Sequence, residues 1–196
     1  MGAAAIVGNQ RITTSSLDTQ VSNLQVAVKP YGSSVQLTTA QMPSAVLSWL
    51  IRFAVMDQVA TANGISVTQA QSQAGRSSLS ATAQQDGATS ISELLIGSGV
   101  PPQLFPQVGR WVAQQIAYDL KLNGGKQVST STQQTKVQNA TTKAECTAAK
   151  SLNIQVSPQF GRLDYTQYTV VPAADTLSKP EPASSPASTE GLTPAC

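Results

Sequence analysis

The side chains that could perform acid–base or nucleophilic chemistry are few and scattered along this 196-residue chain. The sequence contains no histidine, which excludes Ser–His and Cys–His nucleophile pairs, a histidine general base and histidine-ligated metals. The carboxylates show no close pairing typical of general acid–base catalysis. Those of the expected folded region are Asp18, Asp57, Asp86, Glu93, Asp119, Glu145 and Asp164. We therefore predict a protein that is not an enzyme and that uses neither a cofactor nor a metal.

Two short motifs resemble catalytic patterns but have simpler structural interpretations. Gly97-Ser98-Gly99 is too short for a nucleotide-binding loop and is typical of the end of a helix. Thr147 and Lys150 place a hydroxyl and an amine on one helical turn, and a solvated helix face explains that spacing better than a catalytic dyad does. Neither motif indicates an enzyme.

The two cysteines of the sequence, Cys146 and Cys196, are far apart and form no CxxC pattern. The sequence therefore predicts neither a zinc ribbon nor a thioredoxin-like redox centre. In an oxidising compartment the two thiols could form a disulfide, which would stabilise the fold by about 3–5 kcal/mol in the chain-entropy model. The alternative is a small apolar residue within a helix and an incidental thiol at the chain end.

Composition limits the classes of partner and compartment. Hydrophobic residues make up 40% of the chain, which is enough for a core. Charged residues make up only 11%, and the net charge of +2 comes without any run of Lys or Arg, so nucleic-acid binding is not expected. No apolar run is long enough for a membrane span, and the start has no signal-peptide pattern. We expect either a cytosolic protein or one whose export signal has been removed.

Large apolar residues on two predicted helices are the candidates for binding polypeptide. Aromatic side chains offer a large contact area to extended or helical segments. The candidate groove residues are Trp49, Leu50, Phe53, Met56, Trp111, Tyr118 and Leu122. The alternative is that most of them pack one helix against the other, since burying each side chain contributes about 1.5–3 kcal/mol. For any single residue, packing is the better interpretation.

The strongest helix signal covers residues 42–63, where the middle of the segment contains only Ser48 and Arg52 as polar residues. A helix that is apolar nearly all round is buried on most sides, so we expect it to be the centre of the fold. Gly64 stands at the position that commonly ends a helix, and Gly75 interrupts the next helical pattern. Further helices are predicted at about 14–29, 69–85, 90–96, 102–122 and 136–152.

Short strands are predicted at the two ends of this helical region. Residues 3–13 contain two apolar pieces around Gly8-Asn9, a pattern typical of a hairpin. Residues 153–157 alternate apolar and polar side chains and are followed by Pro158, which ends a strand. Lone strands at the ends of a helical domain have only each other to pair with. We therefore expect these two segments to lie side by side.

Together these elements predict a mainly α fold. It consists of five or six helices around a long central helix, with a small two- or three-stranded sheet that pairs the N- and C-terminal segments. One domain is expected over residues 1–171. Residues 172–196 contain almost no large apolar side chain, so we predict a disordered tail rich in Pro, Ser, Ala and Thr.

Three segments, in this order and spacing, resemble a known family. Residues 4–13 read AAIVGNQRIT, residues 62–68 read ANGISVT, and residues 156–164 read VSPQFGRLD. They are similar to the opening strand, the end of the long helix and the closing V-N-P-R-F/Y-G-x-W-D segment of the SurA N-terminal domain. That domain belongs to the SurA/trigger-factor peptide-binding superfamily, and the chain looks especially like small exported lipoproteins of high-GC Gram-positive bacteria. The likeness spans about residues 3–172.

In the third segment, Ser157, Gln159 and Leu163 replace the Asn, Arg and Trp of the family pattern. Many relatives also carry a parvulin-type prolyl isomerase domain before that segment. Here only about thirty residues separate Leu122 from Asn153, too few for such a domain, and the pair of histidines that it normally needs is missing. The resemblance therefore implies a form without isomerase activity.

The resemblance implies an exported, membrane-anchored lipoprotein precursor that acts outside the cytoplasm. Its implied role is that of a chaperone-like module that binds unfolded or nascent exported polypeptides without catalysis. The alternative is a structural or interaction protein of the cell envelope that binds one specific partner. The first function predicts an apolar cleft and suppression of client aggregation, whereas the second predicts a closed, well-packed body.

Overall fold

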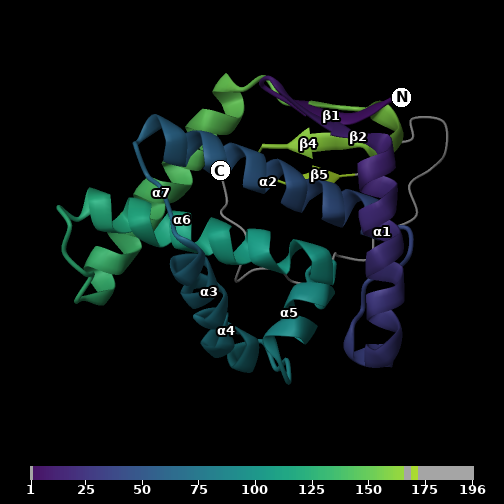
Figure 1. Ribbon diagram of the computed structural model, residues 1–196, viewed down its shortest axis with the longest axis horizontal. Coiled ribbons are helices and arrows are strands. Elements are labelled where there is room, and N and C mark those ends of the chain that lie inside the picture. The colour runs from purple at the N-terminus through teal and green to yellow at the C-terminus, as the bar shows by residue number, and fades with distance from the viewer. Residues whose placement is uncertain (1, 166–168, 172–196) are drawn as a thin grey trace.

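The computed structural model describes residues 2–165 and 169–171 (Figure 1). The predicted tail, residues 172–196, lies outside this described part. The predicted mainly α fold with a small sheet is confirmed. The helices are α1 (Thr14–Val28), α2 (Met42–Ala62), α3 (Gln69–Ser77), α4 (Leu79–Gln85), α5 (Ile91–Gly97), α6 (Phe105–Leu122) and α7 (Ser131–Ser151). The strands are β1 (Ala3–Val7), β2 (Gln10–Thr13), β3 (Gln155–Val156), β4 (Arg162–Asp164) and β5 (Thr169–Val171).

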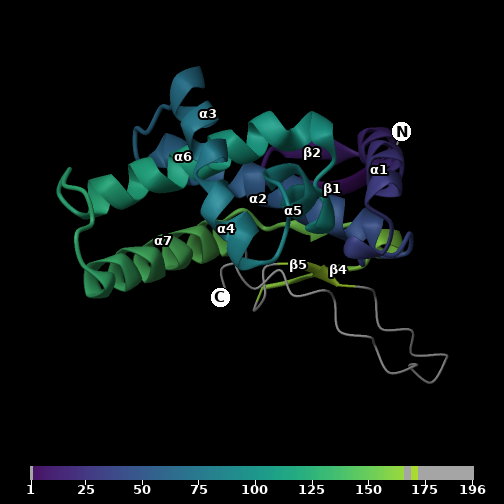
Figure 2. The same ribbon diagram turned by 90° about the horizontal axis from the view of Figure 1, so that it is seen from below.

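Helix α2 is the predicted central helix, and its burial follows from its apolar sequence. Figure 2 shows α2 between α6 on one side and the β4–β5 hairpin on the other. Trp49, Val55 and Met56 are almost completely inaccessible to solvent. By length and composition α2 could cross a membrane, but 67% of its most apolar 18-residue stretch is buried inside the fold. Packing against the neighbouring elements is a sufficient reason for its hydropathy.

The small sheet joins the two ends of the domain, as predicted. Strand β1 pairs antiparallel with β2 through the two-residue turn Gly8-Asn9, where Gly8 has a φ of 57°. On its other edge β1 pairs antiparallel with β3, which follows α7 in the chain. The strand order is therefore β2-β1-β3, with β2 at one edge. The sheet packs against α2 through β1 (Figure 1).

Three elements differ from the sequence-based prediction. The helix expected at 69–85 is divided into α3 and α4 at Ser78, whereas Gly75 lies inside α3. Helix α7 begins at Ser131 rather than near residue 136, because the Thr130 side chain caps it by accepting a hydrogen bond from the Gln133 amide. The β4–β5 hairpin was not predicted. It is attached to α2 by a hydrogen bond of 2.8 Å from the Val170 amide to the Ser48 hydroxyl oxygen.

Gly75 permits a close crossing of α3 and α6 and does not break α3. It faces Gly109 of α6, and a Cβ atom placed on Gly75 would lie 2.6 Å from the Gly109 carbonyl oxygen. A Cβ atom on Gly109 would lie 2.3 Å from the Ser72 carbonyl oxygen. Both distances are shorter than van der Waals contact, so the backbones of α3 and α6 can approach this closely only without side chains.

Candidate functional site

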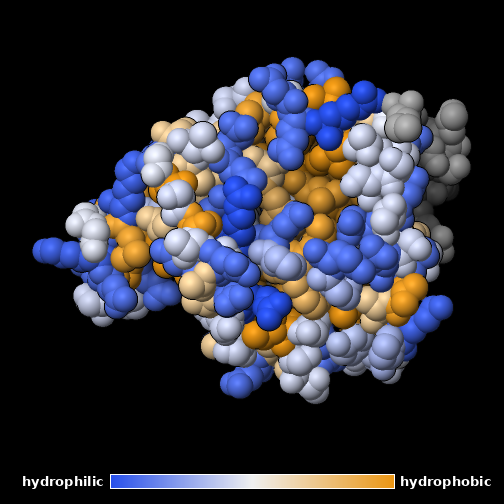
Figure 3. Space-filling view, viewed as in Figure 1, coloured by the Kyte–Doolittle hydropathy of each residue, from blue (hydrophilic) through white to orange (hydrophobic). Residues whose placement is uncertain are grey.

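A hollow of about 450 Å³ opens on the face where β2, α1 and α6 surround the middle of α2. Its apolar floor is formed by Ile12, Leu50, Phe53, Ala54 and Trp111. Its polar rim comes from Gln10, Arg11, Thr13, Ser16, Asp57, Gln107, Arg110 and Gln114. In Figure 3 the hydrophobic floor is visible below the β1–β2 hairpin, with hydrophilic side chains around it.

Two helices present the same spacing to this hollow. From α2 come Leu50, Phe53, Ala54 and Asp57, and from α6 come Gln107, Arg110, Trp111 and Gln114. Each set follows the i, i+3, i+4, i+7 pattern that places residues on one face of a helix. The hollow therefore lies where one face of α2 meets one face of α6.

An ion pair joins the two helices at the rim. The Arg110 guanidinium lies 2.9 Å from the Asp57 carboxylate, and the Gln114 side-chain amide donates a 2.8 Å hydrogen bond to the same Asp57 oxygen. The Arg110 and Asp57 side chains are 55% and 37% exposed, so this pair contributes at most about 1 kcal/mol to stability. It fixes a polar edge beside the apolar floor.

The structure separates the seven predicted groove residues into three groups. Leu50, Phe53 and Trp111 line the hollow, and of these only Leu50 is more than slightly exposed. Trp49, Met56 and Tyr118 are buried in the core, and Leu122 is 44% exposed near the end of α6, outside the hollow. Most of the seven side chains therefore pack the body of the protein, as the alternative interpretation expected.

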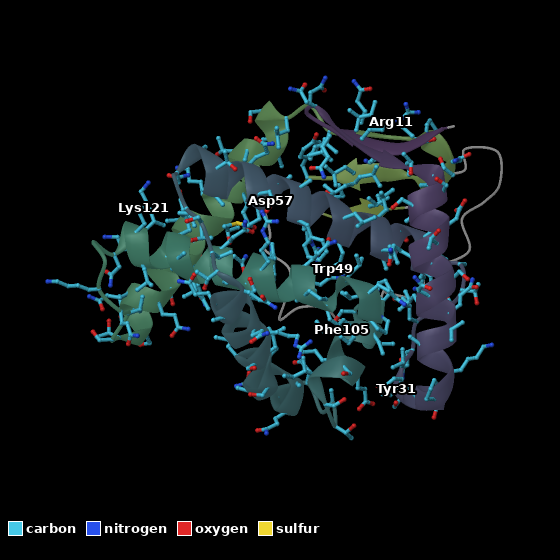
Figure 4. The ribbon with its side chains drawn as sticks, in the orientation of Figure 1. Arg11, Tyr31, Trp49, Asp57, Phe105 and Lys121 are labelled. Atoms are coloured by element: carbon cyan, nitrogen blue, oxygen red, sulfur yellow. The ribbon has the colours of Figure 1, made fainter. Side chains whose placement is uncertain are left out.

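Trp49 is the centre of that packing (Figure 4). Its ring contacts Trp111 edge-on at a centroid distance of 5.5 Å and Phe53 at 5.7 Å. Its indole N–H donates a 2.8 Å hydrogen bond to the Ser98 carbonyl oxygen. A large aromatic ring with its polar atom satisfied is stable in a core. Trp49 thus supports the floor of the hollow from beneath.

A second groove, of about 510 Å³, lies between the C-terminal half of α2 and α7. Its apolar surface comes mainly from small side chains, Ala62, Ala140, Ala144 and Ala148, together with Val59 and Leu152. It contains no aromatic lining residue. Small side chains provide little contact area for a bound segment, which makes this groove the weaker candidate.

A buried polar cluster between α6 and α7 escaped the sequence analysis. Glu145 is 2% exposed and accepts a 3.0 Å hydrogen bond from the Gln115 side-chain amide. Burial raises the pKa of Glu145 to about 7, against the opposing effects of the Gln115 hydrogen bond and the charge of Arg52. Burial also raises the pKa of Asp119, which accepts a hydrogen bond from the Thr141 hydroxyl.

The spacing of this cluster could have revealed it. Gln115 and Asp119 are four residues apart on α6, and Thr141 and Glu145 are four residues apart on α7, so each pair occupies one helix face. None of these four residues lines either of the two hollows described above, and the hydrogen bonds Gln115–Glu145 and Thr141–Asp119 join α6 to α7. Within the described ranges, no group of three His, Cys, Asp or Glu residues could hold a metal ion.

Cys146, beside this cluster on α7, is buried and disulfide-bonded. For Cys146, the structure therefore has the disulfide that the sequence allowed, and not merely a small apolar residue within a helix. Cys196 lies outside the residues that the structure describes.

No protein family, curated protein or solved structure matches this chain.

Proposed function

We propose that this chain is a chaperone-like module that acts outside the cytoplasm and binds unfolded or extended polypeptide segments without catalysis. The observation on which this proposal depends is the hollow between β2, α1 and α6. Its floor is apolar and partly aromatic, its rim is polar, and its volume of about 450 Å³ lies within the usual range of ligand sites. Such a site binds apolar side chains of a client while its rim stays hydrated.

The chemistry of the rim supports a polypeptide rather than a reacting small molecule. The rim contains amides, hydroxyls and two guanidinium groups, but Asp57 is its one carboxylate. Asp57 already interacts with Arg110 and Gln114, so it is held as a structural anion. Amides and hydroxyls both donate and accept hydrogen bonds, which suits the backbone of any extended segment.

An extracytoplasmic location is supported by two properties of the chain. Cys146 is disulfide-bonded, and disulfides persist mainly in oxidising compartments such as the cell exterior. Charged residues make up only 11% of the sequence, and exported proteins more often have such amide- and hydroxyl-rich surfaces. A lipid-anchored precursor, as implied by the resemblance to SurA-like lipoproteins, belongs to the same proposal.

A second candidate function is that of an interaction protein of the cell envelope that binds one specific partner. The burial of Trp49, Phe53, Met56, Trp111 and Tyr118 favours it, because a well-packed core leaves little apolar surface for many different clients. This candidate uses the same hollow but predicts a single, defined complex.

A holdase assay distinguishes the two functions. The chain is added to a chemically unfolded client, and aggregation on dilution is followed by light scattering. We expect the wild type to slow aggregation, Leu50→Gln in the floor to lose most of that effect, and Leu122→Gln to retain it. Leu122 is the matched control, since it is an exposed leucine outside the hollow.

Circular dichroism must show that both variants remain folded. Suppression that is equal in the two variants would overturn the assignment of the hollow. No suppression by the wild type, together with one stoichiometric envelope partner whose binding requires Leu50, would replace the chaperone function with the second candidate.

A further inference from the structure

Helix α7 is held to the fold unevenly along its length. Of residues 131–140, Val137 alone is buried, and the connection from α6 at residues 123–130 contains no buried residue. Figures 1 and 2 show this half of α7 extending, together with the end of α6, beyond the rest of the molecule. The first half of α7 therefore has little apolar contact that holds it in place.

The second half of α7 is anchored to the sheet. Ala149 is completely buried, and Cys146 is buried and disulfide-bonded. At the C-terminal end of α7, the Leu152 carbonyl oxygen accepts a 2.9 Å hydrogen bond from the Gly8 amide of the β1–β2 turn. Strand β3 follows and pairs with β1. A movement of α7 would therefore begin at its N-terminal half and hinge at this anchored end.

Two polar pairs join the middle of α7 to α6, between the exposed half and the anchored end. The Gln115 side-chain amide donates a 3.0 Å hydrogen bond to the Glu145 carboxyl group, and the Thr141 hydroxyl donates one to Asp119. Glu145 is 2% exposed, so its carboxyl group is separated from water while α7 is in place.

The surroundings of Glu145 disfavour its charged form. Burial has the largest effect and raises the pKa of Glu145 to about 7, although the Gln115 hydrogen bond and Arg52 of α2 lower it. Asp119 of α6 adds a repulsion that raises the pKa further, and the lysines of α7 nearest in sequence, Lys143 and Lys150, are exposed. Because a buried anion is costly, ionisation favours any form in which this carboxylate reaches water.

Helix α7 also covers apolar surface of α2. Ala144 and Ala148 pack against a cluster of apolar side chains that includes Met56 and Val59 of α2. Val59 is only 4% exposed, and it lines the groove between α2 and α7. A displacement of α7 would therefore uncover part of the central helix.

We propose that α7 is a proton-sensitive cover of α2, whose residues 131–145 leave α6 and α2 when Glu145 ionises while the end at Leu152 stays attached. The opened form widens the α2–α7 groove and exposes Val59 with its apolar neighbours. This regulation depends on the packing of α7 and does not rest on the function proposed for the hollow.

The direction of the change follows from linkage. The pKa of Glu145 is about 7 in the closed form, whereas an accessible glutamate has the value 4.5. The raised pKa stabilises the closed form fully below about pH 4.5, and this stabilisation is lost as the pH rises through about 7. Between pH 5.5 and pH 8 the population of the opened form should therefore rise on the order of twentyfold.

Native-state amide hydrogen exchange of the full chain at pH 5.5 and pH 8, corrected for the intrinsic exchange rate, tests this proposal. A detached polar helix of this length is marginal in water, so its amides exchange whenever α7 opens. We expect the opening of residues 135–145 to rise about twentyfold with pH and to exceed that of residues 50–58 by about tenfold or more. Equal protection of the two segments would mean that α7 leaves only on global unfolding, which would overturn the proposal.

Two variants assign the pH dependence to its source. Glu145→Gln keeps the shape of the side chain but cannot ionise, so the opening of residues 135–145 should change with pH by less than about threefold. Asp18→Asn removes an exposed carboxylate on α1 and should retain the wild-type rise. Circular dichroism checks that both variants are folded at both pH values. A rise of wild-type size in Glu145→Gln, or no rise in the wild type, would contradict the role of Glu145.

Discussion

The two sides of α2 are held by different kinds of interaction. Towards α6, the contact is made by aromatic and aliphatic side chains around Trp49, and the polar groups lie at the rim of the hollow. Towards α7, the contact is made mainly by small residues, and the buried Glu145 of α7 interacts electrostatically with Arg52 of α2. The stability that apolar packing contributes hardly depends on pH, whereas the contribution of a buried carboxyl group changes as that group ionises. The comparison teaches that the α6 side supports the proposed site and the α7 side can respond to pH.

The largest expected effect comes from removing the centre of the α6 side. Trp49→Ala should lower the free energy of unfolding by about 3–5 kcal/mol, because it leaves a cavity between Phe53 and Trp111 and an unpaired Ser98 carbonyl. Urea unfolding followed by circular dichroism measures this change. A loss below about 1 kcal/mol would show that the aromatic contact does not hold the two helices together.

The α7 side should give the protein a pH-dependent stability. Burial raises the pKa of Glu145 to about 7, from a value of 4.5 for the accessible group. Between these values the folded state binds more protons than the unfolded state, so stability falls as pH rises. The contribution is fully present below about pH 4.5, is lost by about pH 7, and amounts to about 3 kcal/mol.

Glu145→Gln isolates this effect from the other titrating groups. It keeps the shape of the side chain but cannot ionise, so the difference in unfolding free energy between variant and wild type should change between pH 4.5 and 7.5. The charges facing Glu145 are Arg52 from α2 and Asp119 from α6. A difference that is constant with pH would contradict the burial of an ionisable group at this contact.

A moderate effect is expected at the crossing of α3 and α6. Gly109→Ala should destabilise the fold by about 1–3 kcal/mol, because the new Cβ would overlap the Ser72 carbonyl oxygen. Gly97→Ala is the matched control, since its Cβ would meet Val35 at an ordinary distance of 3.9 Å. Thermal unfolding compares the two variants, and equal melting temperatures would contradict the close approach of the helices.

The smallest effect is expected at the rim of the hollow. Arg110→Ala removes an exposed ion pair with Asp57 and should change the unfolding free energy by less than about 1 kcal/mol. Its stability can be measured by urea unfolding alongside Trp49→Ala. A larger loss would mean that the α6 side depends on this charge rather than on apolar packing.

The central helix, the hairpin and the pairing of the chain ends could be predicted because each follows from a local pattern. A nearly continuous apolar helix has to be central, and the two terminal strands have no other partner. The β4–β5 hairpin could not be predicted, since its position depends on a hydrogen bond between Val170 and Ser48 that connects distant parts of the chain. Gly75 was misread because a glycine that breaks a helix and one that permits a crossing look the same in sequence.

The candidate site was only partly visible in the sequence. Leu50, Phe53 and Trp111 were selected for their size, and the structure brings them together in one hollow. That β2 lines the hollow could not be predicted, because the local sequence of Gln10 to Thr13 does not indicate which helices pack beside the strand. Likewise, Glu145 was visible as a carboxylate, but its burial depends on how α7 packs.

Amide hydrogen exchange of the full chain, with and without a saturating, chemically unfolded client, tests the central claim most directly. The account predicts that the client slows exchange in the segments that line the hollow between β2, α1 and α6, while amides of the α2–α7 groove are unchanged. A bound client that protects the α2–α7 groove and leaves the segments around the hollow exchanging as before would contradict it.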